Sequence, residues 1–313
     1  ANSFEADGQQ LRTWIAAGSF SRAEQLLNQA VKSDRLTDNG LDYADAVLVS
    51  AVSQKDVLFT PQLLARLNQW VTQSPRSSMA YAVRSYFTQS YLWEDMALEI
   101  GKRSLKCPPT DDDLERLGIS LADASIALSL DAKNPLALTS KLRLGKVGAL
   151  AQNGQAQNGK HAVAVESVFQ ALIAVKPDSF QAHLEKASYL WSQDQSGSGQ
   201  AALSFLRQAA AQAPADSALP MLVPMMHIQI ANHRADYRQY LSQPQVWQEI
   251  QTSSERVVAQ HPNAVPYWSM LADVATVTGR TELARRYQHI AINRAVTHPA
   301  DQTWPKMMTS VYK

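Results

Sequence analysis

The sequence contains a single cysteine, Cys107, among its 313 residues. One thiol excludes an internal disulfide framework and a cysteine-rich zinc site. Cys107 precedes Pro108, and its simplest role is a small packed side chain, because a reactive thiolate needs a positive and partly open setting. Among the seven histidines, His227 and His233 are six residues apart and do not share one face of a helix. We therefore expect no metal site and no cofactor.

The sequence also lacks a charge excess and a long apolar run. Its 29 basic and 28 acidic residues leave a formal net charge of +1, without a block of lysine or arginine, so nucleic acid and anionic membranes are not favoured as partners. The longest uncharged apolar stretch, 217–232, is interrupted by Pro220 and Pro224 and is too short to span a membrane. The first residue is Ala1 instead of Met, which is compatible with a removed signal segment or a trimmed chain, and leaves bacterial cytoplasm and periplasm both open.

Sequence motifs of the common enzyme classes are missing as well. No G-x-S-x-G, Walker loop, dinucleotide fingerprint, H-E-x-x-H or EF-hand loop occurs. The acidic triplet 111–113 follows Thr110 and is interpreted as the start of a helix rather than a metal site. We expect a non-enzymatic protein. The alternative is an enzyme whose site lies in a groove, which would require two or more titratable side chains that converge in a pocket with mutual hydrogen bonds.

A regular helical rhythm is what the sequence does contain, and it is clearest in residues 261–292. Apolar residues recur there with the spacing of one helix face, and Gly279 then interrupts the pattern. The same spacing resumes after Thr281 and Glu282, which suit the first turn of a helix. This predicts a helical hairpin that needs neighbours to bury its two apolar faces. The apolar positions are Tyr267, Trp268, Leu271, Val274, Ala275, Leu283, Ala284, Tyr287, Ile290 and Ala291.

Similar units recur along the chain at variable spacing. Each consists of a proline, a short polar step and an apolar helix, and most follow an alanine-rich helix. Residues 43–52 resemble a strand in composition, but their i, i+3, i+4 spacing favours a helix. The sequence therefore predicts an all-α fold, an α-solenoid of antiparallel helix pairs. We expect one domain, 1–313, with possible sub-blocks 1–107 and 108–313. The recurring prolines are Pro75, Pro135, Pro177, Pro214 and Pro262.

The final hairpin resembles a tetratricopeptide (TPR) repeat. The matching positions are Trp268, Leu271, Ala272, Ala275, Gly279, Ala284 and Ala291. Residues 63–210 also resemble an uncharacterised bacterial family of the same helical superfamily, through "LNQWVTQSPRSSMA", "YLWED", "LDAKNPLALTSKLRL", "VKPDSFQAHLEKASYLW" and "SGSGQ". These resemblances imply a TPR-like helical fold. They imply no activity, because that bacterial family carries none that is settled.

The fold class and the missing motifs favour a protein–protein interaction scaffold that holds a peptide or protein in a concave helical groove. By analogy, the partner would be a secreted bacterial effector that this chain accompanies or neutralises, or a component assembled in the cell envelope. A structural homo-oligomer is a further alternative and would show an apolar patch on an end hairpin. Projecting the register of the final hairpin onto earlier pairs places the following residues on the groove: Gln181, Leu184, Ser188 and Trp191 of one pair, Thr139, Leu142 and Lys146 of another, and Asp273 and Thr276 of the last.

Two details of this prediction concern the hairpin loops. Trp191 could instead close its hairpin against the loop that follows it. The polar segments 152–159 and 193–200 are rich in Gly, Gln, Asn and Ser, and we expect them to be the most mobile internal segments. Both fall between the two helices of a pair, which predicts that they emerge on one edge of the stack.

Overall fold

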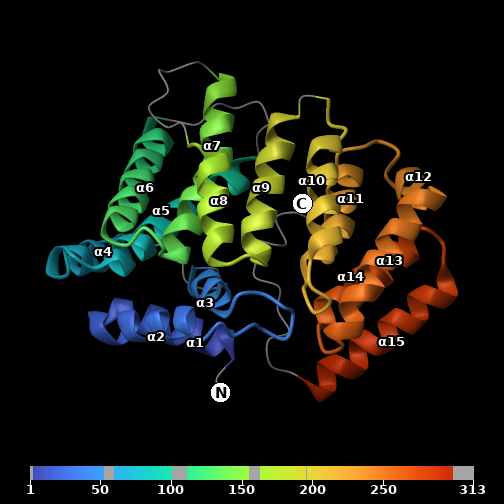
Figure 1. Ribbon diagram of the computed structural model, residues 1–313, viewed down its shortest axis with the longest axis horizontal. Helices are drawn as coiled ribbons and strands as arrows, with labels where there is room; N and C mark the ends of the chain where they lie inside the picture. The colour runs from blue at the N-terminus through green and yellow to red at the C-terminus, as the bar shows by residue number, and fades with distance from the viewer. Residues whose placement is uncertain (1–2, 53–59, 101–110, 155–162, 195, 299–313) are drawn as a thin grey trace. The chain divides into compact units, whose positions relative to one another are not determined.

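The computed structural model describes residues 3–52, 60–100, 111–154, 163–194 and 196–298, and the side chains among them except those of 91–100, 111–114 and 146–154. These residues form fifteen α-helices, one 3-10 turn and a single isolated bridge between Leu36 and Asp42, without a strand (Figure 1). The prediction of an all-α fold of antiparallel helix pairs is thus confirmed. In the described part, no helix is long and apolar enough to cross a membrane. Cys107 lies outside the described residues.

The chain forms two compact units, and both are discontinuous in sequence. The first unit comprises Ala1–Glu5, Leu36–Val49 and Asp178–Lys313, and the second comprises Ala6–Arg35 and Ser50–Pro177. These divisions differ from the sub-blocks 1–107 and 108–313 suggested by the sequence. The helices on either side of that suggested boundary belong to the same unit and pack along each other.

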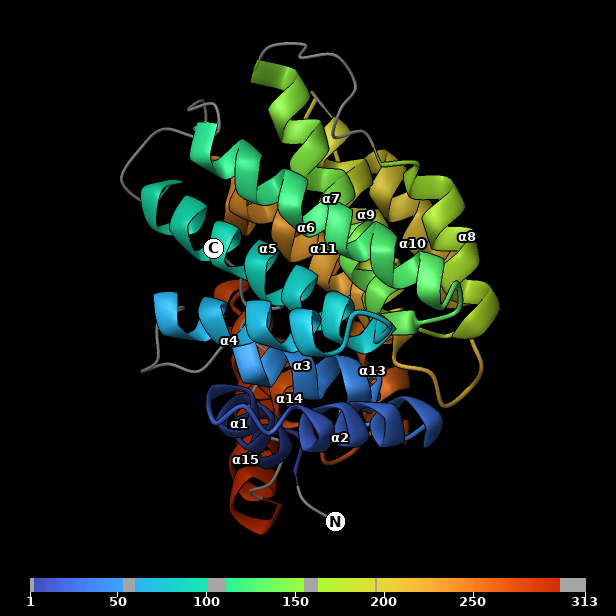
Figure 2. The same ribbon diagram turned by 90° about the vertical axis from the view of Figure 1, so that its left-hand side faces the viewer.

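The second unit contains most of α1 (Phe4–Ala16), then α2 (Phe20–Lys32), α4 (Pro61–Gln73), α5 (Ser78–Ile100), α6 (Asp111–Leu130), α7 (Pro135–Gly154) and α8 (Val165–Val175). Helices α5, α6 and α7 pack against one another, with α6 on the outside of this unit (Figure 2). Side chains fix the helix starts: the Thr60 hydroxyl accepts a hydrogen bond from the Leu63 amide at 3.2 Å, and Asn134 accepts from two amides at the start of α7. Between α2 and α4, Phe20 stacks on Trp70 with ring centroids 5.5 Å apart.

The first unit contains most of α3 (Tyr43–Val52), then α9 (Phe180–Gln193), α10 (Gln200–Gln212), the 3-10 turn Leu219–Met221, α11 (Leu222–Asn232), α12 (Tyr237–Ser242), α13 (Pro244–Gln260), α14 (Val265–Val277) and α15 (Thr281–Thr297). One continuous apolar core joins α9 to α15 and includes Leu203, Met225, Ile250 and Leu271. The fully buried Tyr267 donates its hydroxyl to the Asn39 carbonyl at 2.6 Å. This bond ties the segment that precedes α3 to α14.

The final hairpin, α14 and α15, has the predicted form. Tyr267, Leu271 and Ala275 are buried along one face of α14, and Gly279 follows it at φ +75° in the left-handed region. Thr281 is the first residue of α15, as the sequence predicted. Trp268 is half-buried, and its ring lies 6.0 Å from that of Tyr287 on the second helix.

The turn between α9 and α10 is held by one carboxylate. Asp194 accepts hydrogen bonds from the amides of Ser196 and Gly199, at 2.9 and 2.7 Å, and from the hydroxyls of both Ser196 and Ser198. These bonds lower the pKa of Asp194 to about 2. The sequence predicted a mobile loop at 193–200 and gave no sign of these hydrogen bonds to Asp194. Most of the other expected loop, 152–159, lies outside the described residues.

Candidate partner-binding surface

Two of the predicted groove residues on α7 are buried and cannot form a surface stripe. Thr139 and Leu142 both have 0% of their surface exposed. The side chain of Lys146, further along α7, lies outside the described side chains. The predicted register assumed that one face of α7 is open to solvent. In the structure α7 packs against α5, α6 and α8, and nearly every residue of 136–145 is buried around the whole helix.

The first half of α9 departs from the predicted groove in the same way. Gln181 and Leu184 are 8% and 6% exposed, and Leu184 belongs to the core of the first unit. The Gln181 amide donates to a Glu185 carboxylate oxygen at 2.6 Å, one turn further along the helix. Ser188 and Trp191, in the second half of α9, are half-buried. They remain candidates for contact with a partner.

Trp191 closes its hairpin and also keeps part of its ring at the surface. It packs against the core, and its ring meets that of His233 edge-on, with centroids 5.3 Å apart. A Cβ atom on Gly199 would lie 3.1 Å from Trp191 Cζ3, so the loop after α9 runs directly against the indole. This contact is the one expected if Trp191 closes its hairpin.

Asp273 and Thr276 are exposed on α14 and lie three residues apart on one face. The Thr276 hydroxyl donates to the Ala272 carbonyl within the helix. Among the described residues, no hydrogen bond or ion pair reaches the Asp273 carboxylate, and partial burial raises its pKa. Tyr237 of α12 is close to it: burial raises the pKa of the Tyr237 hydroxyl, and the negative charge of Asp273 adds to this shift. The Asp273 carboxylate thus acts on the Tyr237 hydroxyl of α12 through its charge, and it accepts no hydrogen bond from the part of the chain that the structure describes.

A buried polar network holds α12 in place. His227 of α11 is 2% exposed, and both its ring nitrogens are engaged. Nδ1 lies 2.8 Å from the Tyr240 hydroxyl of α12, and Nε2 lies 2.8 Å from Glu249 Oε2 of α13. The two carboxylate oxygens of Glu249 accept from Nε and Nη2 of Arg207 on α10, each at 2.7 Å. Four helices are therefore joined through one histidine.

The protonation state of the network follows from its surroundings. Burial lowers the pKa of His227, so its ring is neutral near pH 7. The neutral ring donates from Nε2 to Glu249, and the Tyr240 hydroxyl donates to Nδ1. The hydrogen bonds from Arg207 are the main reason why the pKa of Glu249 falls to about 2. Both ring nitrogens of His227 are engaged in these bonds, and the network positions α12 relative to α11 and α13.

Sequence reasoning did not identify this network. Tyr240 and Glu249 lie 13 and 22 residues from His227 in the sequence, and such separations form no local motif. The spacing of His227 and His233 in the sequence bears only on a shared helix face and does not point to Tyr240 or Glu249. In the described part of the chain, no group of three or more His, Cys, Asp or Glu side chains could hold a metal ion.

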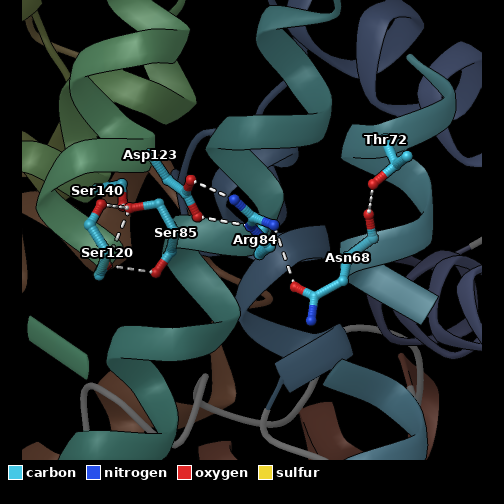
Figure 3. Close-up of polar contacts among 7 residues, drawn as sticks. All are labelled: Asn68, Thr72, Arg84, Ser85, Ser120, Asp123 and Ser140. Carbon is cyan, nitrogen blue, oxygen red and sulfur yellow. Dashed lines mark hydrogen bonds and ion pairs between the residues drawn. The ribbon is translucent and has the colours of Figure 1, made fainter. Parts of the chain in front are cut away.

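The second unit contains a buried cluster of hydroxyl groups at the contact of α5, α6 and α7 (Figure 3). Ser85, Ser120 and Ser140 each have 0% of their surface exposed. The Ser85 hydroxyl lies 2.7 Å from the Ser140 hydroxyl, and the Ser120 hydroxyl donates to the Ser85 carbonyl at 2.8 Å. Gln89 donates from Nε2 to the Ser140 carbonyl at 3.2 Å. These bonds satisfy polar groups where small side chains let three helices approach closely.

An ion pair adjoins this serine cluster. Arg84 of α5 donates from Nε and Nη2 to the two carboxylate oxygens of Asp123 on α6, both at 2.7 Å (Figure 3). Its Nη1 donates to the Asn68 side-chain oxygen of α4 at 3.1 Å. Asp123 is almost completely buried, and its hydrogen bonds raise the pKa of Arg84. The arrangement clamps α4, α5 and α6 together.

The comparisons with known proteins support no conclusion about the fold or the function. No family model matches the chain, and no curated protein matches it. A solved structure that does match is a monomeric mutant of IFIT1 with Gppp-AAAA, at 14% sequence identity over 88% of this chain and 68% of that chain, with a TM-score of 0.30. The assignment of the fold to antiparallel helix pairs therefore rests on the helices described above.

Proposed function

We propose that this chain is a non-enzymatic scaffold that binds a protein or peptide partner on the surface of the first unit around α12. The carrying observation is a set of accessible side chains on helices of the first unit. Trp191 lies beside His233 at the end of α11, and Asp273 and Thr276 are exposed on one face of α14. Partly exposed aromatic side chains held by packing are typical anchors of protein interfaces.

The buried network behind this surface supports the proposal. Tyr240 and Tyr237 lie one turn apart on the short helix α12, and Tyr240 is bonded to His227. Fixing one face of α12 presents its other side chains in a constant position. A surface that is ordered before binding loses less conformational entropy when the partner docks.

The biological settings that we propose are those that the sequence resemblance suggested. One is a bacterial protein that accompanies or neutralises a secreted effector, and the other is an assembly factor of the cell envelope. Both rest on analogy with bacterial helical-repeat proteins of this general kind. The support for each is analogy, and neither enters the argument for the binding surface.

The proposal can be tested by affinity capture from an extract of the source organism. The variant Thr276→Arg places a long charged side chain on the surface, and Thr297→Arg makes the matched change at an exposed position of α15. We expect one protein, at about equal molar ratio, to be captured by the wild type and by Thr297→Arg and lost with Thr276→Arg. Equal capture by both variants, or the absence of a stoichiometric partner, would refute the proposal.

A structural homo-oligomer is the second candidate, because two helices expose aliphatic side chains. Ile126 and Leu130 on α6 are 40% and 41% exposed, and Ile292 and Val296 on α15 are 57% and 76% exposed. Exposed apolar stripes of this kind can mark an interface between copies. Light scattering that shows a stable dimer, abolished by Ile126→Glu or Ile292→Glu, would favour this function instead.

A further inference from the structure

His227 is the buried end of the contact that fixes α12. Its ring is 2% exposed, its Nδ1 lies 2.8 Å from the Tyr240 hydroxyl, and its Nε2 lies 2.8 Å from Glu249 Oε2. In the neutral ring, the Tyr240 hydroxyl donates to Nδ1, and Nε2 donates to Glu249. A second ring proton must bind to Nδ1, on the side where the Tyr240 hydroxyl already points its hydrogen. Proton uptake is therefore opposed by the contact between α11 and α12.

The charged groups around the ring do not compensate a positive charge on it. Among the described residues, α10 contributes Arg207 and α13 contributes Glu249. Helix α12 contributes Tyr240, and the turn Leu219–Met221 against α11 has no ionisable side chain. The Glu249 carboxylate already balances the Arg207 guanidinium through two hydrogen bonds of 2.7 Å. Burial lowers the pKa of His227 and outweighs the hydrogen bond to Glu249, which raises it.

Helix α12 is the neighbour of the ring that can move away at the lowest cost. It has six residues, and Leu241 is its one buried side chain. Tyr237 and Tyr240 are half-buried, and the chain on both sides of the helix, at 232–235 and 242–245, is exposed. Displacement of this short helix would bring water to Nδ1 while α10, α11 and α13 keep their mutual contacts. The ring could then carry a hydrated positive charge.

We propose that proton uptake by His227 releases α12 from its packed position, and that the partner-binding surface around α12 is lost with it. The second part rests on the proposed function, and the first part does not. A proton binds best to the state in which the ring is hydrated, so acid shifts the population toward displaced α12. The displaced fraction is lowest above the ordinary histidine pKa of about 6.5. It rises as the pH falls from there, by at most about tenfold per pH unit, until the ring of the packed state also takes up a proton.

Hydrogen exchange measured by mass spectrometry tests the release on the full chain without a partner. The ratio of displaced to packed α12 is obtained from the protection of the peptide 237–243 at pH 7 and pH 5, corrected for the intrinsic pH dependence of amide exchange. In the wild type we expect this ratio to rise severalfold, and by no more than the limit of about 30-fold for one proton between pH 6.5 and pH 5. The protection of 265–277 on α14 should change less.

Two histidine variants complete this experiment. His227→Gln cannot take up the proton and should show no such rise, whereas His289→Gln, at an exposed position of α15, should behave like the wild type. A rise of equal size in His227→Gln, or no rise for 237–243 beyond that for 265–277, would overturn the release of α12. If His227→Gln does not fold at pH 7, the comparison of the two peptides within the wild type decides the question.

Affinity capture from the extract at pH 7 and pH 5 separates this inference from the proposed function. The wild type and His289→Gln should lose the captured protein at pH 5, and His227→Gln should retain it. Capture by the wild type that is equal at both pH values would overturn the link between the proton and the surface. The absence of any stoichiometric partner at pH 7 would refute the proposed function, and the exchange experiment would still decide whether protonation releases α12.

Discussion

The ion pair between Arg84 and Asp123 shows how single polar residues hold the second unit together. Asp123 has 3% of its side chain exposed, and each of its oxygens accepts one hydrogen bond from Arg84. Removal of one partner from such a pair leaves a charge that water reaches poorly. The loss of stability on removing one partner is larger than the net stabilisation by the intact ion pair. In the intact pair, the cost of taking both charges out of water already offsets much of their mutual attraction.

Asp123→Ala should therefore lower the free energy of unfolding by about 2–4 kcal/mol. Glu115→Ala, at an exposed position of the same helix, should change it by less than about 0.5 kcal/mol. Urea denaturation followed by circular dichroism measures both. A loss at Asp123 no larger than that at Glu115 would mean that the ion pair does not clamp the helices.

A second prediction at the scale of one residue concerns His227 and pH. The pKa of His227 is lowered in the folded chain, so the unfolded chain binds a proton more readily. The contribution of the neutral His227 to the free energy of unfolding is fully present above the ordinary histidine pKa of about 6.5. It is lost as the pH falls below about 6.5 and through the lowered pKa of the folded chain. One proton corresponds to a slope of at most about 1.4 kcal/mol per pH unit.

The wild type should thus lose more stability between pH 7 and pH 5 than His227→Gln, which cannot take up that proton. Unfolding free energies in urea at several pH values measure the two slopes. The comparison holds even if the variant is less stable at every pH, because only the slopes are compared. Parallel slopes would show that His227 is not held neutral by burial.

At the scale of elements, substitutions of two glycines in the turn between α9 and α10 allow the cost of backbone strain to be measured apart from the cost of overpacking. Gly197 and Gly199 both have positive φ, +65° and +69°. A Cβ on Gly197 would meet nothing within 4 Å, whereas one on Gly199 would lie 2.4 Å from Ile230 Cδ1 and 2.6 Å from its Cγ1. Because Ile230 is buried in the core, it has little room to move away.

Gly197→Ala should cost only the left-handed backbone term, about 1–2 kcal/mol. Gly199→Ala should cost that term and a further 1–3 kcal/mol or so from overpacking against Ile230. Thermal or urea unfolding of the two variants gives the comparison directly. Equal losses would indicate that the turn is free to move away from α11.

Helices with one buried face were predicted well from the sequence, and helices buried on all sides were not. In α14 the apolar spacing matches the buried face. In α3, which is buried nearly all round, the spacing favoured a helix over a strand correctly but could not show which residues are covered. In α7 and the first half of α9, Thr139 and Gln181 were assigned to the groove by projection of the register of the final hairpin, and both are buried. Periodicity cannot reveal that other helices cover such residues as well.

At the scale of the whole molecule, contacts between residues far apart in the chain could not be predicted from the sequence. Each unit is built from separate segments of the chain. In the first unit, Leu36–Val49 lies far in sequence from Asp178–Lys313. The bond from Tyr267 to the Asn39 carbonyl joins residues 228 positions apart. The network around His227, which positions the candidate surface, is likewise assembled from separate helices. Neither link has a local signature.

The central claim is that a partner docks on the first unit around α12. Its most direct test is photo-crosslinking, with p-benzoylphenylalanine in place of Thr276 and, in separate proteins, in place of Ile126 on α6 and Ile292 on α15. Mass spectrometry of the irradiated cells would then identify the adducts. We predict one heterologous protein attached at position 276 and none at 126 or 292. The absence of an adduct at 276, together with adducts of a partner or a second copy at 126 or 292, would contradict the account.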